Sequence, residues 1–250
     1  MIYELRRRQP LIEVRFFASA PFSGASAIAV CAFATLGGFL FLNTLYLQDV
    51  RGLSPLDAGL YTLPMAVMIL ILAPLSGRLV GTRGTRLPLV IGSLGLTSSG
   101  ALLTQLTVHT SLALLIVAYL LFGIGFGFVN PPITNTAVSG MPPSQAGVAA
   151  AVASTSRQVG ATLGVAVLGA VAGGGAVGAI GPGFSAATHT SWWIVAGLGV
   201  AELGLALLTT SRWALRTAGA TAERFREEPP PARRDAPDVA VDERAEVATG

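Results

Sequence analysis

Arg157 and Glu202 are the residues of this sequence best suited to chemistry, because each lies within a long uncharged stretch. No charged residue separates Arg86 from Arg157, or Arg157 from Glu202. A guanidinium and a carboxylate in such surroundings can bind a charged substrate, exchange a proton, pair with each other or share a water-filled cavity. A structural interpretation stays open for both: Arg157 can tie helices together through backbone carbonyls, and Glu202 can merely neutralise it.

Isolated polar side chains form a second set of candidates. Asn43 and Asn130 each interrupt a long apolar run, and Tyr46, Gln48 and Gln158 lie within or beside such runs. These side chains can line a substrate path, or they can form interhelical hydrogen bonds that contribute about 1 kcal/mol or less each. The spacing of the titratable residues suggests no metal-ligand cluster and no nucleophile–base pair. We therefore predict neither an enzyme nor a bound metal or cofactor, and no nucleic-acid partner.

The composition indicates which elements must position these residues. The chain has 250 residues, of which 52% are hydrophobic and 12% charged, and it contains 30 glycines. Ordinary soluble domains carry about 25% charged residues, so this chain has too little polar surface to cover a water-soluble particle. The mean hydropathy of +0.65 agrees. This balance excludes a soluble enzyme and predicts a protein that crosses a lipid bilayer several times.

Glycine, proline and charged residues divide the apolar sequence into six segments. Each can form a helix that crosses a hydrocarbon core about 30 Å thick. The period-two alternation that marks strands is absent, and helices satisfy their own backbone groups in lipid. The predicted fold is an all-α polytopic membrane domain over residues 22–211, with spans at 22–47, 58–77, 87–106, 112–136, 146–171 and 192–210.

The placement of arginine predicts the orientation of these spans. Arginines cluster in residues 1–21, in the loop between the second and third spans, and in residues 212–250, whereas the opposite side has only Arg51. The positive-inside rule then puts both termini on the cytoplasmic side of the plasma membrane. Residues 1–21 are expected to be a cytoplasmic connector, and the proline-rich, mixed-charge residues 212–250 a disordered cytoplasmic tail.

Two local patterns predict how individual helices bend and pack. Pro131 and Pro132 remove two backbone donors from the fourth span and should kink it, which makes them candidates for a gate. Kinks also occur in static helices, so a purely structural role stays open. Gly160 and Gly164 form a small-xxx-small pattern on the fifth span, which predicts close approach of a neighbouring helix.

Five stretches, taken in order, resemble one family of membrane proteins. The first resembles the opening helix and outer loop of the C-terminal half of major facilitator superfamily transporters. The set as a whole is similar to the 14-spanner drug/proton antiporters, over about residues 3–211. The stretches are FLNTLYLQDVRGLSPLDAGLYTLP (41–64), GRLVGTRGTR (77–86), GIGFGFVNPP (123–132), MPPSQAG (141–147) and STSRQVGATLGVAVLG (154–169).

The second stretch resembles the cytoplasmic loop motif of that superfamily, which is linked to gating. The aspartate of the motif falls on Gly81 and the following arginine on Thr82, so the charge relay of the family is not carried over to this copy. The positions that match the motif are Gly77, Leu79, Gly84 and Arg86. Arg78, between the first two, is also a candidate residue of this loop.

The resemblance implies one six-helix half of a secondary transporter. Such a protein would export small, amphipathic compounds by alternating access, coupled to protons. Substrate sites in these folds lie near the bilayer midplane between two halves, so the chain is expected to need an N-terminal half of six or more helices, or to associate with itself. The alternative is a non-transporting membrane fragment or assembly subunit from a truncated transporter gene, which the loss of the motif aspartate at Gly81 favours.

Overall fold

The computed structural model describes residues 19–138, 146–175, 187–211, 214 and 216–217. Every regular element in this part of the chain is a helix, which confirms the predicted all-α class. Most of the predicted connector (1–21) and of the predicted tail (212–250) lies outside the described residues.

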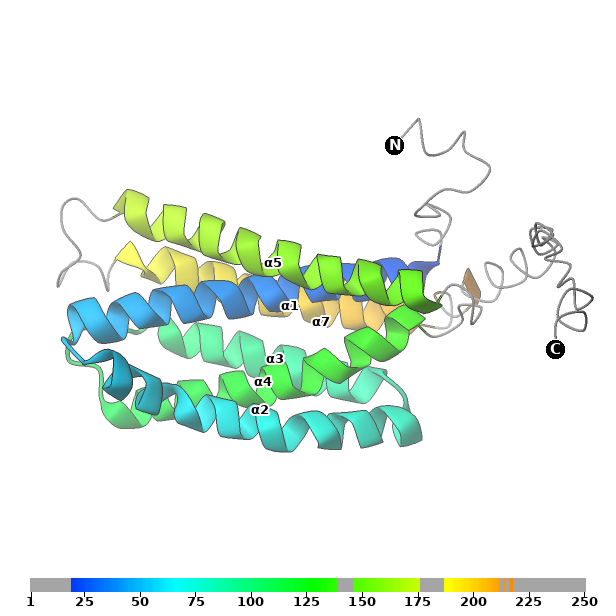
Figure 1. Cartoon of the computed structure of the whole chain (residues 1–250), viewed down its shortest axis with the longest axis horizontal. Coiled ribbons are helices and arrows are strands. Elements are labelled where there is room, and N and C mark those ends of the chain that lie inside the picture. The colour runs from blue at the N-terminus through cyan, green and yellow to red at the C-terminus, as the bar shows by residue number, and fades with distance from the viewer. Residues whose placement is uncertain (1–18, 139–145, 176–186, 212–213, 215, 218–250) are drawn as a thin grey trace, which may run out of the picture.

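The six predicted spans correspond to six long α-helices, with one short π-helical segment after the first. Five of the six, all except α5, are apolar and long enough to cross a membrane by length and composition. That α5 also crosses stays a prediction. The elements, labelled as in Figure 1, are α1 (Ala20–Leu45), η3 (Tyr46–Val50), α2 (Pro55–Arg83), α3 (Arg86–Leu103), α4 (Leu112–Val138), α5 (Ala146–Gly175) and α7 (His189–Thr209).

The predicted loop between the second and third spans is mostly helical. Arg78 and Arg83 lie on the last turns of α2, and only Gly84 and Thr85 separate α2 from α3. The sequence 77–83 continues the helix as far as Arg83. Gly84 ends it with φ +78°, a left-handed conformation that residues with a Cβ rarely adopt.

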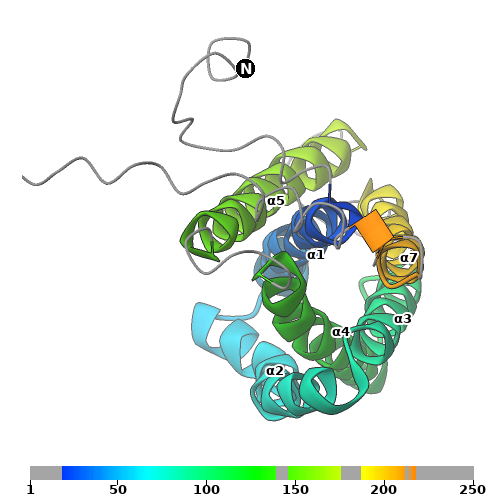
Figure 2. The ribbon, with the colours of Figure 1, turned by 90° about the vertical axis from the view of Figure 1, so that its right-hand side faces the viewer.

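The helices lie side by side along the longest axis of the molecule (Figure 1). Viewed from one end, α1, α4, α3 and α7 form a ring, with α5 packed outside α1 and α2 packed outside α4 (Figure 2). Helix α1 therefore lies between α5 and α7. This position of α1 decides which candidate residues can meet.

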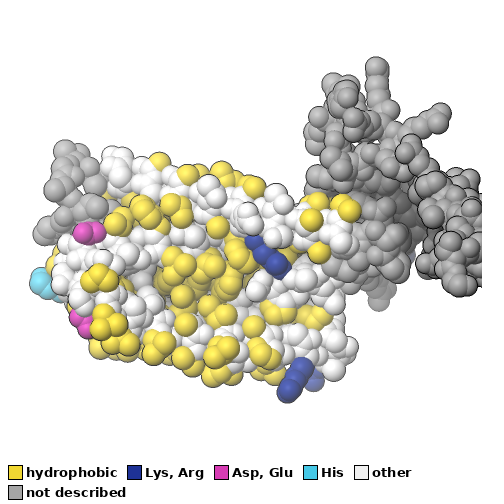
Figure 3. Space-filling view, in the orientation of Figure 1, with side chains coloured by type: hydrophobic (Ala, Val, Ile, Leu, Met, Phe, Trp, Pro, Cys, Tyr) yellow, Lys and Arg dark blue, Asp and Glu magenta, His cyan; other side chains and the backbone are white. Residues whose placement is uncertain are grey.

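Both ends of the helical domain lie at the same end of the molecule. The backbone N–H of Ala20, at the start of α1, donates to the hydroxyl of Thr217, 3.1 Å away and just beyond α7. The arginines that end α2 and start α3 lie at this end, whereas acidic and histidine side chains lie at the opposite one (Figure 3). The charge asymmetry inferred from the sequence is therefore an asymmetry between the two ends of the structure.

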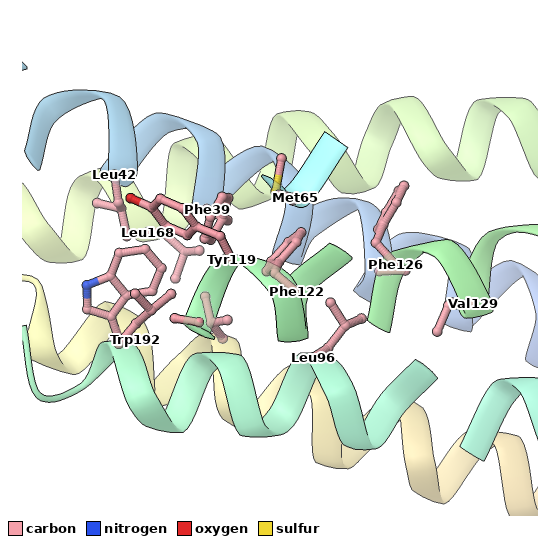
Figure 4. Close-up of a cluster of buried hydrophobic side chains, with 14 of the residues drawn as sticks. Phe39, Leu42, Met65, Leu96, Tyr119, Phe122, Phe126, Val129, Leu168 and Trp192 are labelled. Carbon is pink, nitrogen blue, oxygen red and sulfur yellow. The ribbon is translucent and has the colours of Figure 1, made fainter. Parts of the chain in front are cut away.

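A continuous group of aromatic rings holds α1, α4 and α7 together. Phe39 of α1 stacks on Phe122 of α4 with ring centroids 4.1 Å apart, and it meets Trp192 of α7 edge-on at 6.0 Å (Figure 4). Phe122 stacks in turn on Phe126, one helical turn further along α4. Such aromatic pairs contribute about 0.5–1.5 kcal/mol each beyond the area they bury.

Glycines set the distance between α1 and α5. A Cβ on Gly160 would lie 2.4 Å from the carbonyl oxygen of Val30, and one on Gly164 only 2.0 Å from that of Ala34. Gly37 approaches Ala161 in the same way from the α1 side, where a Cβ would lie 2.5 Å from the carbonyl oxygen. The close packing predicted from the small-xxx-small pattern is confirmed.

Helix α4 remains helical through Pro131 and Pro132. Its C-terminal part turns away from α2 and toward α5, as the predicted kink requires (Figure 1). On the N-terminal side of the prolines, Gly123 lies against α2, where a Cβ would be 2.6 Å from the carbonyl oxygen of Met65. One helix thus contacts α2 with one part of its length and α5 with another.

The contact between α1 and α5 can be tested by filling it. We expect Gly164→Val to lower the free energy of unfolding by about 1–3 kcal/mol or more, because the new side chain collides with backbone that cannot rotate away. Thermal unfolding of the purified protein in detergent measures this. Gly204→Val is the matched control, since a Cβ there meets nothing within 4 Å. Equal unfolding temperatures for the two variants would contradict the packing described.

Candidate functional site

Arg157 lies eleven residues into α5, about 16 Å along the helix from its start. Its guanidinium donates a hydrogen bond to the hydroxyl of Thr134 on α4 and lies over the ring of Phe33 on α1, 5.7 Å from the centroid. Within the described part of the chain, its buried Nε has no hydrogen-bond partner. A charge midway along the bundle is therefore held by one neutral hydroxyl and one aromatic face.

The α4 side of this site is a stripe of residues on successive turns. Phe126, Asn130 and Thr134 are spaced by four and so share one face of the helix. The ring of Phe126 meets that of Phe33 edge-on at 5.2 Å, and the buried Oδ1 of Asn130 accepts no hydrogen bond from the described residues. We call the five residues the Arg157 cluster: Phe33, Phe126, Asn130, Thr134 and Arg157.

The surface around the cluster is unusually polar for a lateral face of a membrane domain. Arg157 is only partly buried, and Thr134 and Gln158 beside it are exposed. Further exposed hydroxyl side chains continue along α5, at Ser154, Thr155 and Thr162. On the face of the molecule in Figure 3, one basic side chain appears midway along its length among apolar ones.

Glu202 is completely buried on α7, and neither of its carboxylate oxygens has a hydrogen-bond partner among the described residues. Gly24 of α1 lies against Thr209 of α7, where its Cβ would be 1.7 Å from the threonine methyl. The two helices are antiparallel, so seven residues forward from Gly24 on α1 and seven residues back from Thr209 on α7 reach the same level. Glu202 therefore lies at the level of Cys31. The two side chains are close enough to interact electrostatically.

The ion pair between Arg157 and Glu202 considered from the sequence is wrong. Arg157 contacts Phe33 on one side of α1 and Thr134 on α4. Glu202 of α7 lies against the other side of α1, next to Cys31. The rise per residue gives the position of each residue along its helix, and both lie well away from the helix ends. It carries no information about which side of α1 each helix occupies.

The polar candidates near the opposite end of α1 form hydrogen bonds within the bundle. The buried Oδ1 of Asn43 accepts a hydrogen bond from the hydroxyl of Tyr119 on α4. The hydroxyl of Tyr46 donates to the carbonyl oxygen of Thr107 at 2.8 Å. Gln48 follows in η3 and is partly buried. These contacts match the structural alternative considered for Asn43 and Tyr46.

The candidates of the loop motif lie apart from the Arg157 cluster. Gly77 and Arg78 are exposed on α2, Gly84 forms the turn, and Arg86 is the exposed first residue of α3. Pro131 and Pro132, by contrast, lie on α4 between Asn130 and Thr134 and so belong to the neighbourhood of the cluster.

Sequence analysis did not identify Phe33, Thr134, Phe126 or Tyr119 as partners of the candidates. The spacing of four around Asn130 could have indicated Phe126 and Thr134. Nothing in the sequence distinguishes Phe33 from the other phenylalanines of α1. In the described ranges, no three His, Cys, Asp or Glu side chains gather as they would to hold a metal ion.

These features define an all-α, multi-pass membrane protein with a cation halfway along one lateral face. Residues 3–165 match the sequence model of the Major Facilitator Superfamily. The match covers well over half of the chain, so the chain belongs to that family.

Three relatives show which branch of the family the chain resembles. It is 36% identical to the multidrug resistance protein Stp of Mycobacterium tuberculosis over 168 residues, which is 67% of this chain and 31% of that protein. It is 36% identical to the tetracenomycin C resistance and export protein of Streptomyces glaucescens over 167 residues, 66% of this chain and 31% of that one. It is 32% identical to the quinolone resistance protein NorB of Staphylococcus aureus over 174 residues, 68% of this chain and 37% of that one. The matched region thus spans about a third of each relative.

The buried hydrogen bond between Tyr119 and Asn43 allows a test of the contact between α1 and α4, the helices that carry Phe33 and Thr134. We expect Tyr119→Phe to lower the free energy of unfolding by about 1–3 kcal/mol, because it leaves the carbonyl of Asn43 buried without its donor. Thermal unfolding in detergent measures the change. Tyr61→Phe on α2, where the side chain is partly exposed, removes the same hydroxyl as a control. A loss no larger than that of the control would show that the contact contributes nothing.

Proposed function

We propose that the chain forms one six-helix half of a transporter that moves small, amphipathic compounds across the plasma membrane. The face formed by α1, α4 and α5 would be one wall of the substrate cavity, with the Arg157 cluster at its centre. The observation that carries this proposal is the partly exposed guanidinium of Arg157, midway along a lateral face of the bundle.

A charge in that position cannot face lipid without a large cost. Placing an arginine at the centre of the hydrocarbon core costs about 2.5–3.5 kcal/mol on insertion scales and more in other treatments. Exposed polar side chains on either side, such as Thr155, Gln158 and Thr162, add to this cost. The face is therefore better suited to water and a second protein wall than to lipid tails.

Helix α2 borders the same face, and its exposure is further evidence for a second protein wall. Only 11% of its most apolar stretch of 18 residues is buried within the chain, against about half for the corresponding stretches of α1, α3 and α4. A second half, on the same polypeptide or another, would cover α2 and α5 and close the cavity, since substrate sites of such transporters lie between two halves. The share of each relative that the chain matches, about a third, leaves room for that half. Self-association of two copies is the other way to supply it.

The same proposal includes an orientation and a direction. Arg78, Arg83 and Arg86 lie at the end of the bundle where α1 begins and α7 ends. By the positive-inside rule this end faces the cytoplasm, and so both termini do. Alternating access to the cavity from that side and from the outer side would move compounds outward, the direction that the name of the tetracenomycin C resistance and export protein gives for that protein.

Glu202 is the residue we propose to couple transport to protons. A carboxylate at its completely buried position, without a cation, costs several kcal/mol. The described neighbours offer little compensation: α1 carries no charged residue and contributes Cys31, and α3 has its single charge, Arg86, at its start. The protonated and ionised forms of Glu202 thus favour different surroundings, and exchange between them would displace α7 relative to α1.

Dye transport into everted membrane vesicles tests this function. The vesicles come from the cells that naturally produce the chain, with deletion of its gene as reference, and ethidium and fluorescein serve as cationic and anionic amphipaths. We expect at least one dye to accumulate only when the gene is intact and a proton gradient is applied. Glu202→Gln should lower the gradient-driven rate by about tenfold or more, within the usual range of coupling free energies.

Asp49→Asn is the matched control for the loss of a carboxylate, because this residue is exposed outside the bundle core. Its transport rate and pH dependence should remain those of the wild type. Dye movement that is the same with and without the gene would contradict a transport function and favour the non-transporting subunit. Full gradient dependence in Glu202→Gln would remove Glu202 from coupling.

A further inference from the structure

We propose that the Arg157 cluster selects aromatic anions, that is, planar aromatic compounds with an ionised acidic group at one edge. This inference rests on the proposed transport function and names the substrate class of its cavity. It combines a cation that has no anionic partner among the described residues, an aromatic platform beneath that cation, and an unused polar group on the adjacent turn of α4.

The guanidinium of Arg157 provides the recognition of charge. Its contacts in the described part of the chain are a neutral hydroxyl, on Thr134, and the face of Phe33. A guanidinium has five N–H donors in a planar fork, and the bond to Thr134 uses one of them. Donors on the two terminal nitrogens remain for a ligand, whereas Nε is buried. Carboxylates and sulfonates match this fork with short, charge-assisted hydrogen bonds, which are about twice as strong as neutral ones.

The charges of the bundle favour an anion at this position and disfavour a cation. The six helices contain one acidic residue deep in the bundle, Glu202, and it lies on the far side of α1 from Arg157. Asp57, the other acidic residue within a long helix, is in the first turn of α2, at the end of the bundle away from Arg83 and Arg86. A cationic ligand beside Arg157 would meet a like charge in surroundings of low dielectric constant, which acts against its binding.

The rings of Phe33 and Phe126 provide the recognition of an aromatic body. They meet edge-on at 5.2 Å, and Phe33 is also the ring over which Arg157 lies. Phe33 is partly exposed, whereas Phe126 is buried and supports it from the core side. A planar compound whose acidic group reaches the guanidinium therefore has its ring system within reach of Phe33. Aromatic contacts of this kind have a preferred geometry and so favour flat substrates over flexible aliphatic acids.

Asn130 provides a third, neutral contact. Its Oδ1 is buried without a partner among the described side chains, one helical turn from Thr134 on the same face of α4. A buried carbonyl without a donor is costly, and a ligand O–H or N–H group would remove that cost. Aromatic acids with a hydroxyl or amino substituent should therefore bind better than unsubstituted ones.

A pair of permanently charged naphthalenes tests the inference directly. Everted vesicles of the natural producer are given 1-naphthalenesulfonate or 1-naphthyltrimethylammonium, which share a ring system and differ in the sign of their charge. We expect gene-dependent uptake of the sulfonate to exceed that of the ammonium compound by about tenfold or more, the advantage of a charge-assisted contact. This comparison needs no variant.

Variants locate the preference in the cluster. Arg157→Gln should lower sulfonate uptake about tenfold and should leave ammonium uptake unchanged or raise it, because the like charge is gone. Arg157→Lys, which keeps the charge but not the fork, should give intermediate sulfonate uptake. Arg216→Gln is the matched control and should behave as the wild type. Arg216 is exposed beyond α7, at the end of the bundle that we propose faces the cytoplasm. Immunoblots of the vesicles confirm equal amounts of chain.

Each remaining outcome decides against the inference, and they can be told apart. Preference for the ammonium compound, or an equal loss of both compounds in Arg157→Gln, overturns the selection of anions while transport itself stands. Gene-dependent transport of ethidium but of neither fluorescein nor the naphthalenesulfonate overturns the aromatic anion as substrate class. If neither the naphthalenes nor the dyes depend on the gene, the transport function fails as well.

Discussion

The proposed function of this bundle depends on keeping the charge of Arg157 out of hydrocarbon. That constraint connects three helices: α5 carries the guanidinium, α4 supplies the hydroxyl of Thr134, and α1 supplies the ring of Phe33. Close packing makes these contacts possible. Gly160 and Gly164 bring α5 onto the backbone of α1, and the turn of α4 after its two prolines brings Thr134 toward α5. Without either device the charge would have fewer partners.

Helix α1 links the two halves of the proposed mechanism. One side carries Phe33 at the Arg157 cluster, and another side, two residues away at Cys31, lies next to Glu202 of α7. A change in the position of α1 relative to α7 would therefore also change the position of Phe33 relative to Arg157. Proton exchange at Glu202 and binding at the cluster could influence each other through this single helix, without contact between the two charged residues.

The sequence was sufficient for the helices and for the depth of the charged residues, because both follow from quantities that act along the chain. Apolar runs bounded by glycine, proline and charge correspond to α1–α5 and α7, and the rise per residue placed Arg157 and Glu202 well away from the helix ends. The arrangement around the bundle axis could not be predicted. Which side of α1 receives α5 or α7 depends on packing between distant segments, so the sequence left open whether Arg157 and Glu202 pair, and in the structure they do not. The roles of Phe33 and Tyr119 remained hidden for the same reason.

The central claim is that the α1–α4–α5 face meets water or protein and not lipid, and labelling measures this most directly. In a Cys31→Ser background, Gln158→Cys on α5 and Val200→Cys on α7 each place a thiol at an exposed position about midway along its helix. A charged, membrane-impermeant maleimide is then applied to intact membranes from both sides. The account predicts rapid labelling at position 158 and negligible labelling at position 200. Equal labelling at the two positions, or none at position 158 while a lipid-soluble maleimide reacts there, would contradict it.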